Sequence, residues 1–232
     1  IGTETNGSIS CPSSINGIIG FKPTVGLVSR SGIVPISSSQ DTAGPMGKTL
    51  KIVAKTLEVI SGYDPEDKAT YLIPNDFDFN FLEVTNNKRL DDIRFGLLNA
   101  DNQNPQVLEL HKEIKSLVKK LGGEVIDIDD DRIYPDAAEY FILLYEFRVG
   151  LQKYLETSSS SMRNLEDIIK FNDENKNTVM PYFGQDIFFQ SLESDSYIQY
   201  MWSKYKIKNS YKATLRLLEE YDLDAFIGLT RG

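Results

Sequence analysis

The sequence of 232 residues contains a single cysteine and a single histidine, Cys11 and His111. One cysteine excludes an internal disulfide and a zinc site built on cysteines, so we interpret Cys11 as a small packed side chain. A Ser-His-Asp triad would have to use His111, which lies between the apolar stripe and the charged face of a predicted helix. We therefore expect His111 to be a solvated surface residue, and a histidine-based triad is disfavoured.

Basic residues are also scarce, because 25 Lys and Arg face 34 Asp and Glu, for a formal net charge of -9. This balance argues against binding to nucleic acid, which requires clustered cations, and against an anionic membrane surface. No apolar run approaches the ~20 residues of a transmembrane helix. No glycine-rich phosphate motif is present, so we expect no nucleotide and no other cofactor. The acidic cluster Asp127, Asp129, Asp130 and Asp131 lacks the glycine and later glutamate of an EF-hand, so we expect a solvated strand end and no metal.

What the sequence does contain is a run of small and polar residues near its start, from Gly2 to Pro12. Ser8 follows a glycine in this run and precedes an apolar segment, so it lies where a tight loop meets regular structure. A nucleophilic hydroxyl and a nest of backbone N–H groups that holds an anion can be built together at such a point. Composition alone would favour an ordinary Ser/Thr/Gly turn.

The order of these residues resembles the loop of the amidase signature family, which reads G-T-(D/E)-x-G-G-S-I-x-x-P and continues to G-(L/F)-K-P-T. The matching positions are Gly2, Thr3, Glu4, Gly7, Ser8, Ile9, Pro12, Gly17, Gly20, Lys22, Pro23 and Thr24. Residues 26–32 and 40–46 form a second matching block. Looser similarity to peptide amidases continues through residues 145–151, 164–172, 182–185 and 222–227, so the resemblance covers nearly the whole chain.

The resemblance implies amide hydrolysis by a Ser–Ser–Lys triad in which Ser8 is the nucleophile. It also implies an oxyanion hole made by the backbone N–H groups of Thr5, Asn6 and Gly7. The family's other serine and its lysine lie upstream of this loop, and neither is among the 232 residues. We therefore interpret residues 1–232 as a single incomplete amidase domain with its N-terminal part missing. Lys22 is not the catalytic lysine in the family pattern, so we expect a structural role for it.

Two positions depart from the family pattern. Asn6 replaces the usual second glycine of the loop. Only its backbone amide would serve the oxyanion hole, whereas its side chain would line the pocket and could bind substrate. Ser10 stands where many members have arginine, which argues against small substrates that carry a carboxylate.

The remainder of the chain predicts an α/β fold, with a mixed or parallel central sheet flanked by helices. Residues 93–98 and 125–128 are predicted strands on either side of a helix that begins at Pro105, and this order predicts a parallel pair with a right-handed crossover. The expected apolar stripe of that helix is Val107, Leu110, Ile114, Leu117, Val118 and Leu121. Other helices are expected over residues 8–16, 48–61, 137–154, 165–171, 185–191 and 197–221, and other strands at 1–2, 18–22 and 225–229. Residues 33–46 and 63–88 are expected to be irregular, the second with at most one helical turn.

Aromatic residues gather between positions 182 and 205, and they allow two interpretations. They could form the wall of an apolar substrate pocket, but their helical spacing is equally well explained by core packing, which we favour. The residues are Tyr182, Phe183, Phe188, Phe189, Tyr197, Tyr200, Trp202 and Tyr205.

The sequence thus predicts a cytoplasmic amidase that cleaves a small amide or a peptide amide through a serine acyl-enzyme. Without the family's lysine and second serine, residues 1–232 alone are expected to be inactive. One alternative is the glutamine-hydrolysing subunit of a glutamyl-tRNA amidotransferase, which releases ammonia from glutamine, but Ser10 and the net charge of -9 argue against it. Another is a folded fragment without catalysis. Because missing strands and helices would expose an apolar edge, a homodimer of the chain is a further hypothesis.

Overall fold

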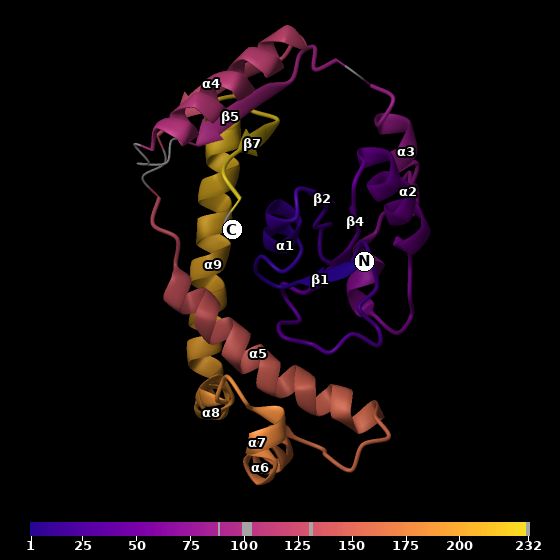
Figure 1. The fold of residues 1–232 in the computed structure, drawn as a ribbon, viewed down its shortest axis with the longest axis vertical. Helices are drawn as coiled ribbons and strands as arrows, with labels where there is room; N and C mark the ends of the chain where they lie inside the picture. Colours follow the sequence, from indigo (N-terminus) through magenta and orange to yellow (C-terminus); the bar gives the residue numbers. More distant parts are fainter. Residues whose placement is uncertain (88, 99–103, 130–131, 231–232) are drawn as a thin grey trace.

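The computed structural model describes residues 1–87, 89–98, 104–129 and 132–230. The elements in chain order are β1 (Gly2–Glu4), α1 (Ser10–Ile15), β2 (Ile19–Gly20), β3 (Thr42–Gly44), β4 (Met46–Gly47), α2 (Leu50–Ile60), the 3₁₀ helix η1 (Lys68–Leu72), α3 (Phe81–Val84), β5 (Arg94–Leu98), α4 (Pro105–Lys120), β6 (Glu124–Ile128), α5 (Asp136–Thr157), α6 (Leu165–Glu174), α7 (Lys176–Val179), α8 (Asp186–Glu193), α9 (Tyr197–Glu220) and β7 (Ala225–Ile227). Figure 1 shows α1, β1, β2 and β4 in the middle of the view, with α2 and α3 on one side and α9 on the other.

A parallel sheet of three strands has β5 at its centre, between β6 and β7. Phe95 lies opposite Val125 of β6 and Ala225 of β7. The crossover from β5 to β6 runs through α4, so the predicted strand–helix–strand unit is confirmed. A Cβ atom on Gly96 would lie 2.7 Å from Leu223 Cδ1, which shows that the centre of this sheet is tightly packed.

The start of the chain forms two small antiparallel pairs, β1 with β3 and β2 with β4. Glu4 lies opposite Thr42, and Gly2 lies opposite Gly44. The prediction that residues 33–46 are irregular was therefore wrong for β3. Its Thr-Ala-Gly sequence carries little strand propensity, and the pairing comes from β1, about forty residues away. A Cβ on Gly44 would lie 2.1 Å from the carbonyl oxygen of Phe21, so this crossing requires glycine.

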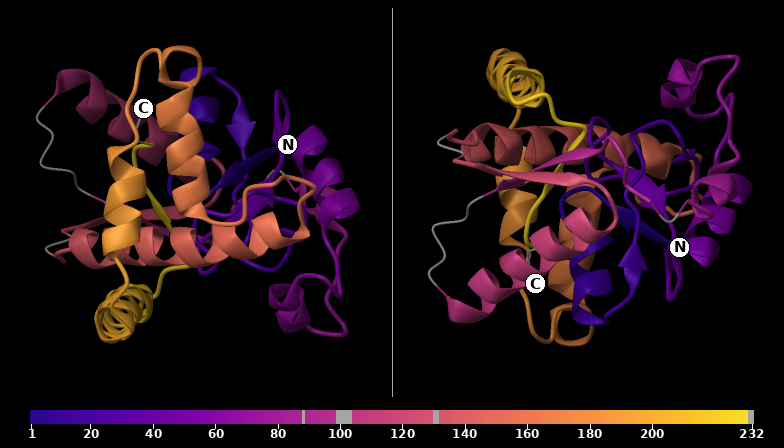
Figure 2. Two further views of the ribbon diagram at one scale, coloured as in Figure 1. Left: turned by 90° about the horizontal axis from the view of Figure 1, so that it is seen from below. Right: turned by 90° about the horizontal axis from the view of Figure 1, so that it is seen from above.

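The second half of the chain is helical, and α5 crosses α8 and α9 (Figures 1 and 2). Tyr145 of α5 stacks on Tyr200 of α9 with ring centroids 4.3 Å apart. A buried cluster of Leu151, Leu155, Leu165 and Ile169 joins α5 to α6. Asn164 caps α6 as predicted, since its side chain accepts a hydrogen bond of 2.8 Å from the Asp167 N–H.

The inward face of α4 differs from the predicted stripe. Leu110 and Leu117 are exposed, whereas His111 is buried with 9% of its surface accessible, so the prediction of a solvated histidine was wrong. The inner line runs through Val107, His111, Ile114 and Val118. Their steps of four, three and four residues follow one face of a helix, and that spacing was available in the sequence.

The aromatic residues of positions 182–205 are mostly exposed, so core packing explains only two of them. Phe188 packs on Phe147 with centroids 5.5 Å apart, and Tyr200 stacks on Tyr145. The other six are exposed, namely Tyr182, Phe183, Phe189, Tyr197, Trp202 and Tyr205. Tyr200 and Ser203 face the interior from α9, and the exposed aromatic residues of α9 lie elsewhere around its circumference.

Residues 63–87 contain two short helices, η1 and α3, where at most one helical turn was expected. The short α7 was also not predicted. Across the residues that the structure describes, no helix combines the length and apolarity needed to cross a membrane.

We expect Leu165→Ala to lower the free energy of unfolding by about 2–5 kcal/mol, because truncating a buried leucine leaves a cavity. Leu165 is 1% exposed in the α5–α6 cluster, whereas Leu117 on α4 is 57% exposed. Leu117→Ala is the matched control and should cost less than about 1 kcal/mol. Equal losses for both variants in chemical denaturation would contradict this description of the core.

Candidate active site

The Ser8 loop, residues 4–10, is organised by the buried side chain of Glu4. One carboxylate oxygen, Oε2, accepts hydrogen bonds of 2.9 Å from the backbone N–H groups of Ile9 and Ser10. The same oxygen accepts a bond of 3.1 Å from the Ser10 hydroxyl. The end of β1 is thereby joined to the first residues of α1, and the chain between them must form a compact loop.

Lys22 holds the other side of this loop. Its ammonium nitrogen donates to the carbonyl oxygen of Thr5 at 2.9 Å and lies 3.4 Å from Glu4 Oε1. The structure therefore gives Lys22 the structural role that was expected from its motif.

Burial by itself would raise the pKa of Glu4, but the interactions that lower this pKa outweigh burial when they are taken together. The backbone N–H groups of Ser10, Ile9 and Gly7, with the charge of Lys22, lower the pKa of Glu4 from 4.5 to about 2. Glu4 is thus a carboxylate at any ordinary pH. Its interaction with the Gly7 amide also places one of the three predicted oxyanion donors near a negative charge.

Thr5 is fixed by a second buried carboxylate. Its hydroxyl donates to Asp41 Oδ1 at 2.5 Å, and Asp41 Oδ2 accepts from the backbone N–H groups of Ile36 and Ser37 at 2.8 Å. Gly7 turns the loop at φ = 96°, a conformation that favours glycine. A side chain there would also approach Cys11 Sγ, because a Cβ would lie 3.2 Å from it.

Ser8 lies at the surface end of this loop. The residue is exposed, whereas the adjacent Ile9 is completely buried. A buried anchor directly after an exposed serine sets the direction of the chain at Ser8. The three predicted oxyanion residues, Thr5, Asn6 and Gly7, form the bend that leads to it. The arrangement can present a hydroxyl beside a group of backbone amides, which is what acyl transfer to a serine requires.

Two buried glutamates of α5, Glu139 and Glu146, face residues 6 and 37–39, and neither had a predicted role. Glu139 Oε1 accepts a hydrogen bond of 2.9 Å from the side-chain amide of Asn6.

Glu146, two helical turns further along α5, accepts hydrogen bonds from the hydroxyls of Ser37 at 2.6 Å and Ser39 at 2.9 Å. Its other oxygen accepts from the Tyr200 hydroxyl at 2.6 Å. Burial opposes ionisation of Glu146, but these hydroxyls and the Ser39 N–H lower its pKa overall, and burial together with Glu146 raises the pKa of Tyr200.

A signal for these glutamates existed in the sequence. Glu139 and Glu146 are seven residues apart in an otherwise largely apolar helix, and this spacing puts both on one face. A carboxylate on a buried face requires hydrogen-bond donors from another part of the chain. The sequence does not say which donors these are.

The described part of the acidic cluster includes an ion pair. Asp127 pairs with Lys115 at 2.6 Å, and Asp130 and Asp131 lie outside the described residues. Across the described part of the chain, no group of three or more His, Cys, Asp or Glu is arranged to hold a metal ion.

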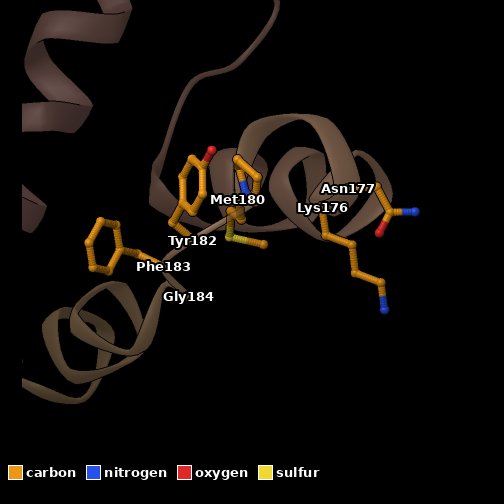
Figure 3. A pocket seen from close by; sticks show the side chains of 7 residues that line it. Lys176, Asn177, Met180, Tyr182, Phe183 and Gly184 are labelled. Carbon is orange, nitrogen blue, oxygen red and sulfur yellow. The ribbon is translucent and has the colours of Figure 1, made fainter.

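A hollow of about 510 Å³ lies beside the short helix α7. It is lined by Lys176, Asn177, Met180, Pro181, Tyr182, Phe183 and Gly184, which follow the end of α6 (Figure 3). Figure 1 shows that α5 runs between this region and the central elements β1 and α1. The hollow therefore does not contribute to a site at Ser8.

We expect Glu4→Gln to reduce the free energy of unfolding by up to about 3 kcal/mol at neutral pH. This value follows because folding lowers the pKa of Glu4 from 4.5 to about 2. The folded-state pKa is the lower one, so this stabilisation is complete above pH 4.5. It disappears as the pH falls through about 2. Denaturation of both proteins across pH 2–7 measures the difference, and a difference that does not change with pH would contradict the assignment.

Comparison with known proteins gives consistent matches. The family model described as Amidase matches residues 1–227. A protein of Arabidopsis thaliana named as a probable amidase is 35% identical over 244 residues, which cover 99% of this chain and 46% of that protein. The chain thus spans about half the length of this curated relative.

Solved structures agree with the sequence matches. The peptide amidase of Stenotrophomonas maltophilia is 33% identical with a TM-score of 0.88, over 100% of this chain and 49% of that one. A glutamyl-tRNA(Gln) amidotransferase subunit of Thermotoga maritima is 27% identical with a TM-score of 0.61, over 93% of this chain and 44% of that one. With the Ser8 loop, its Lys22 anchor and these matches in agreement, the chain belongs to the amidase signature family.

Proposed function

We propose that the protein hydrolyses a carboxamide through an acyl-enzyme on Ser8. Ser8 Oγ attacks the carbonyl carbon of the substrate, and the resulting oxyanion accepts hydrogen bonds from the amides of Thr5, Asn6 and Gly7. Collapse of this intermediate breaks the C–N bond and releases ammonia or an amine, which takes up a proton. Water then attacks the ester carbonyl, releasing the carboxylic acid and returning the proton to Ser8.

The observation that carries this proposal is the exposed Ser8 on a loop fixed at both of its ends. Glu4 holds the backbone of Ile9 and Ser10, while Lys22 and Asp41 hold Thr5. A loop fixed in advance does not need to reorganise when charge develops on the substrate oxygen, and this is how such sites stabilise a transition state.

We propose a peptide amide as the substrate class. Support comes from the TM-score of 0.88 to a peptide amidase over the whole chain, against 0.61 to the glutamyl-tRNA(Gln) amidotransferase protein. Ser10 supports the same choice, because its hydroxyl is bonded to Glu4 and it brings no positive charge to a substrate carboxylate. Glutamine hydrolysis is the second candidate, since the amidotransferase protein shares the fold.

We propose that the proton acceptor for Ser8 lies outside residues 1–232. Lys22 is occupied by Glu4 and the Thr5 carbonyl. His111 is buried on α4, which Figure 1 shows well apart from α1. The family resemblance supplies the alternative, a lysine acting through a second serine, both upstream of the loop in relatives.

We expect Ser8→Ala to reduce hydrolysis of a peptide amide by the natural full-length polypeptide by more than about 10³-fold, because the nucleophile is lost. Ser14→Ala is the matched control, as Ser14 is an exposed serine of α1. Ammonia release from a peptide amide and from glutamine measures both activity and substrate class. Activity of Ser8→Ala equal to that of the control would disprove the role of Ser8.

The polypeptide of residues 1–232 by itself should show no turnover of an unactivated amide. A serine hydroxyl without a proton acceptor loses the contribution of general base catalysis, which is on the order of 10²–10⁴-fold. The same ammonia assay on this polypeptide measures the effect. Turnover that disappears in Ser8→Ala would show that a base lies among these residues after all.

A further inference from the structure

The Ser8 loop has one polar side chain, that of Asn6, that its two main anchors do not hold. Thr5 is fixed on one side by Asp41 and Lys22, and residues 9 and 10 are fixed on the other by Glu4. Asn6 and Gly7 lie between these points. The backbone on either side is held, because the Thr5 carbonyl accepts from Lys22 and the Gly7 carbonyl accepts from the Cys11 N–H at 2.8 Å. A partner for the Asn6 side chain adds a further constraint on the peptide groups between these points.

The side chain of Asn6 is held by α5. Its amide nitrogen donates to Glu139 Oε1 at 2.9 Å, across 133 positions of sequence. Glu139 is 9% exposed, so this carboxylate has been taken out of water and requires a donor. It also lies in the first turn of α5, where a negative charge interacts favourably with the helix dipole.

The carboxylate of Glu139 is a firm anchor, because α5 is held by further contacts. Glu146, on the same helix face, bonds to Ser37, Ser39 and Tyr200. Tyr134 also interacts with Glu139. Burial first, then the charge and hydrogen bond of Glu139, raise the pKa of Tyr134 to about 12.

We propose that Glu139 is a positioning residue for the oxyanion hole, acting through the hydrogen bond from the side chain of Asn6. This inference rests on the proposed function of the Ser8 loop. It assigns to Asn6 a role in orienting its own peptide groups, in place of the direct substrate contact suggested by its sequence position. It also makes position 6 and position 139 a matched pair, in which one side chain donates and the other accepts.

The matched pair predicts a specific rescue. In Asn6→Asp, a carboxylate would face the buried Glu139 carboxylate, and the two would repel. Glu139→Gln alone retains an acceptor for Asn6. When both changes are combined, the glutamine amide can donate to the aspartate, so the hydrogen bond returns with its direction reversed.

The test compares these variants in the natural full-length polypeptide with a peptide amide as substrate. We expect Asn6→Asp to lower kcat by about tenfold or more with KM changed less than about threefold, because misplaced donors weaken the transition state more than the bound substrate. Glu139→Gln should lower kcat less than Asn6→Asp does, and the double variant should recover most of the kcat that Asn6→Asp loses. Asn209→Asp, which adds the same charge at an exposed site on α9, is the control.

An Asn6→Asp variant as active as the control, or a double variant no better than Asn6→Asp, would overturn the pairing. Thermal unfolding of each variant shows whether it is folded. If Asn6→Asp does not fold, Asn6→Ala and Glu139→Ala replace it, and each should lower kcat about tenfold with no further loss when combined. Additive losses would then contradict the proposal. An active Ser8→Ala would instead show that the proposed function itself has failed.

Discussion

The buried carboxylate of Glu4 is the constraint on which the Ser8 loop depends. It ends a strand, yet its oxygens bind backbone N–H groups at the start of the next helix and the ammonium of Lys22. A charged group in the interior is stable only when donors surround it, so the chain must return to Glu4 within a few residues. That return produces the tight bend at Gly7 and leaves Ser8 exposed beside the completely buried Ile9.

The same principle joins the two halves of the chain. Asp41, Glu139 and Glu146 are buried acidic residues, and each accepts hydrogen bonds from a segment that is distant in sequence. Apolar packing, such as Tyr145 on Tyr200, brings α5 and α9 together. The carboxylates then fix which loops meet these helices, because a buried charge that loses its partner costs about 3–5 kcal/mol. The position of α5 relative to the Ser8 loop follows from these pairs, and so does its proposed influence on catalysis.

Local patterns in the sequence predicted much of this structure. The β5–α4–β6 unit, the cap at Asn164, most of the helices and the structural role of Lys22 were all available from spacing or motif. Features that depend on a distant partner were not. The strand β3 exists because β1 pairs with it, and His111 is buried because α4 is rotated slightly from the predicted stripe. The buried Glu139 is bonded to Asn6, which lies 133 positions earlier in the chain. At the site, the sequence identified the loop and its resemblance to amidases, but it could not identify the carboxylates that hold the loop.

The rate at which a fluorophosphonate labels Ser8 measures whether Glu4 holds the loop in its reactive form. The probe should be applied to the natural full-length polypeptide and to its Glu4→Gln variant, with the labelled residue located by mass spectrometry of peptides. We predict a label on Ser8 and a labelling rate at least about tenfold lower in Glu4→Gln, because the loop is no longer held in its reactive form. A label on another residue, or equal rates in the two proteins, would contradict this prediction.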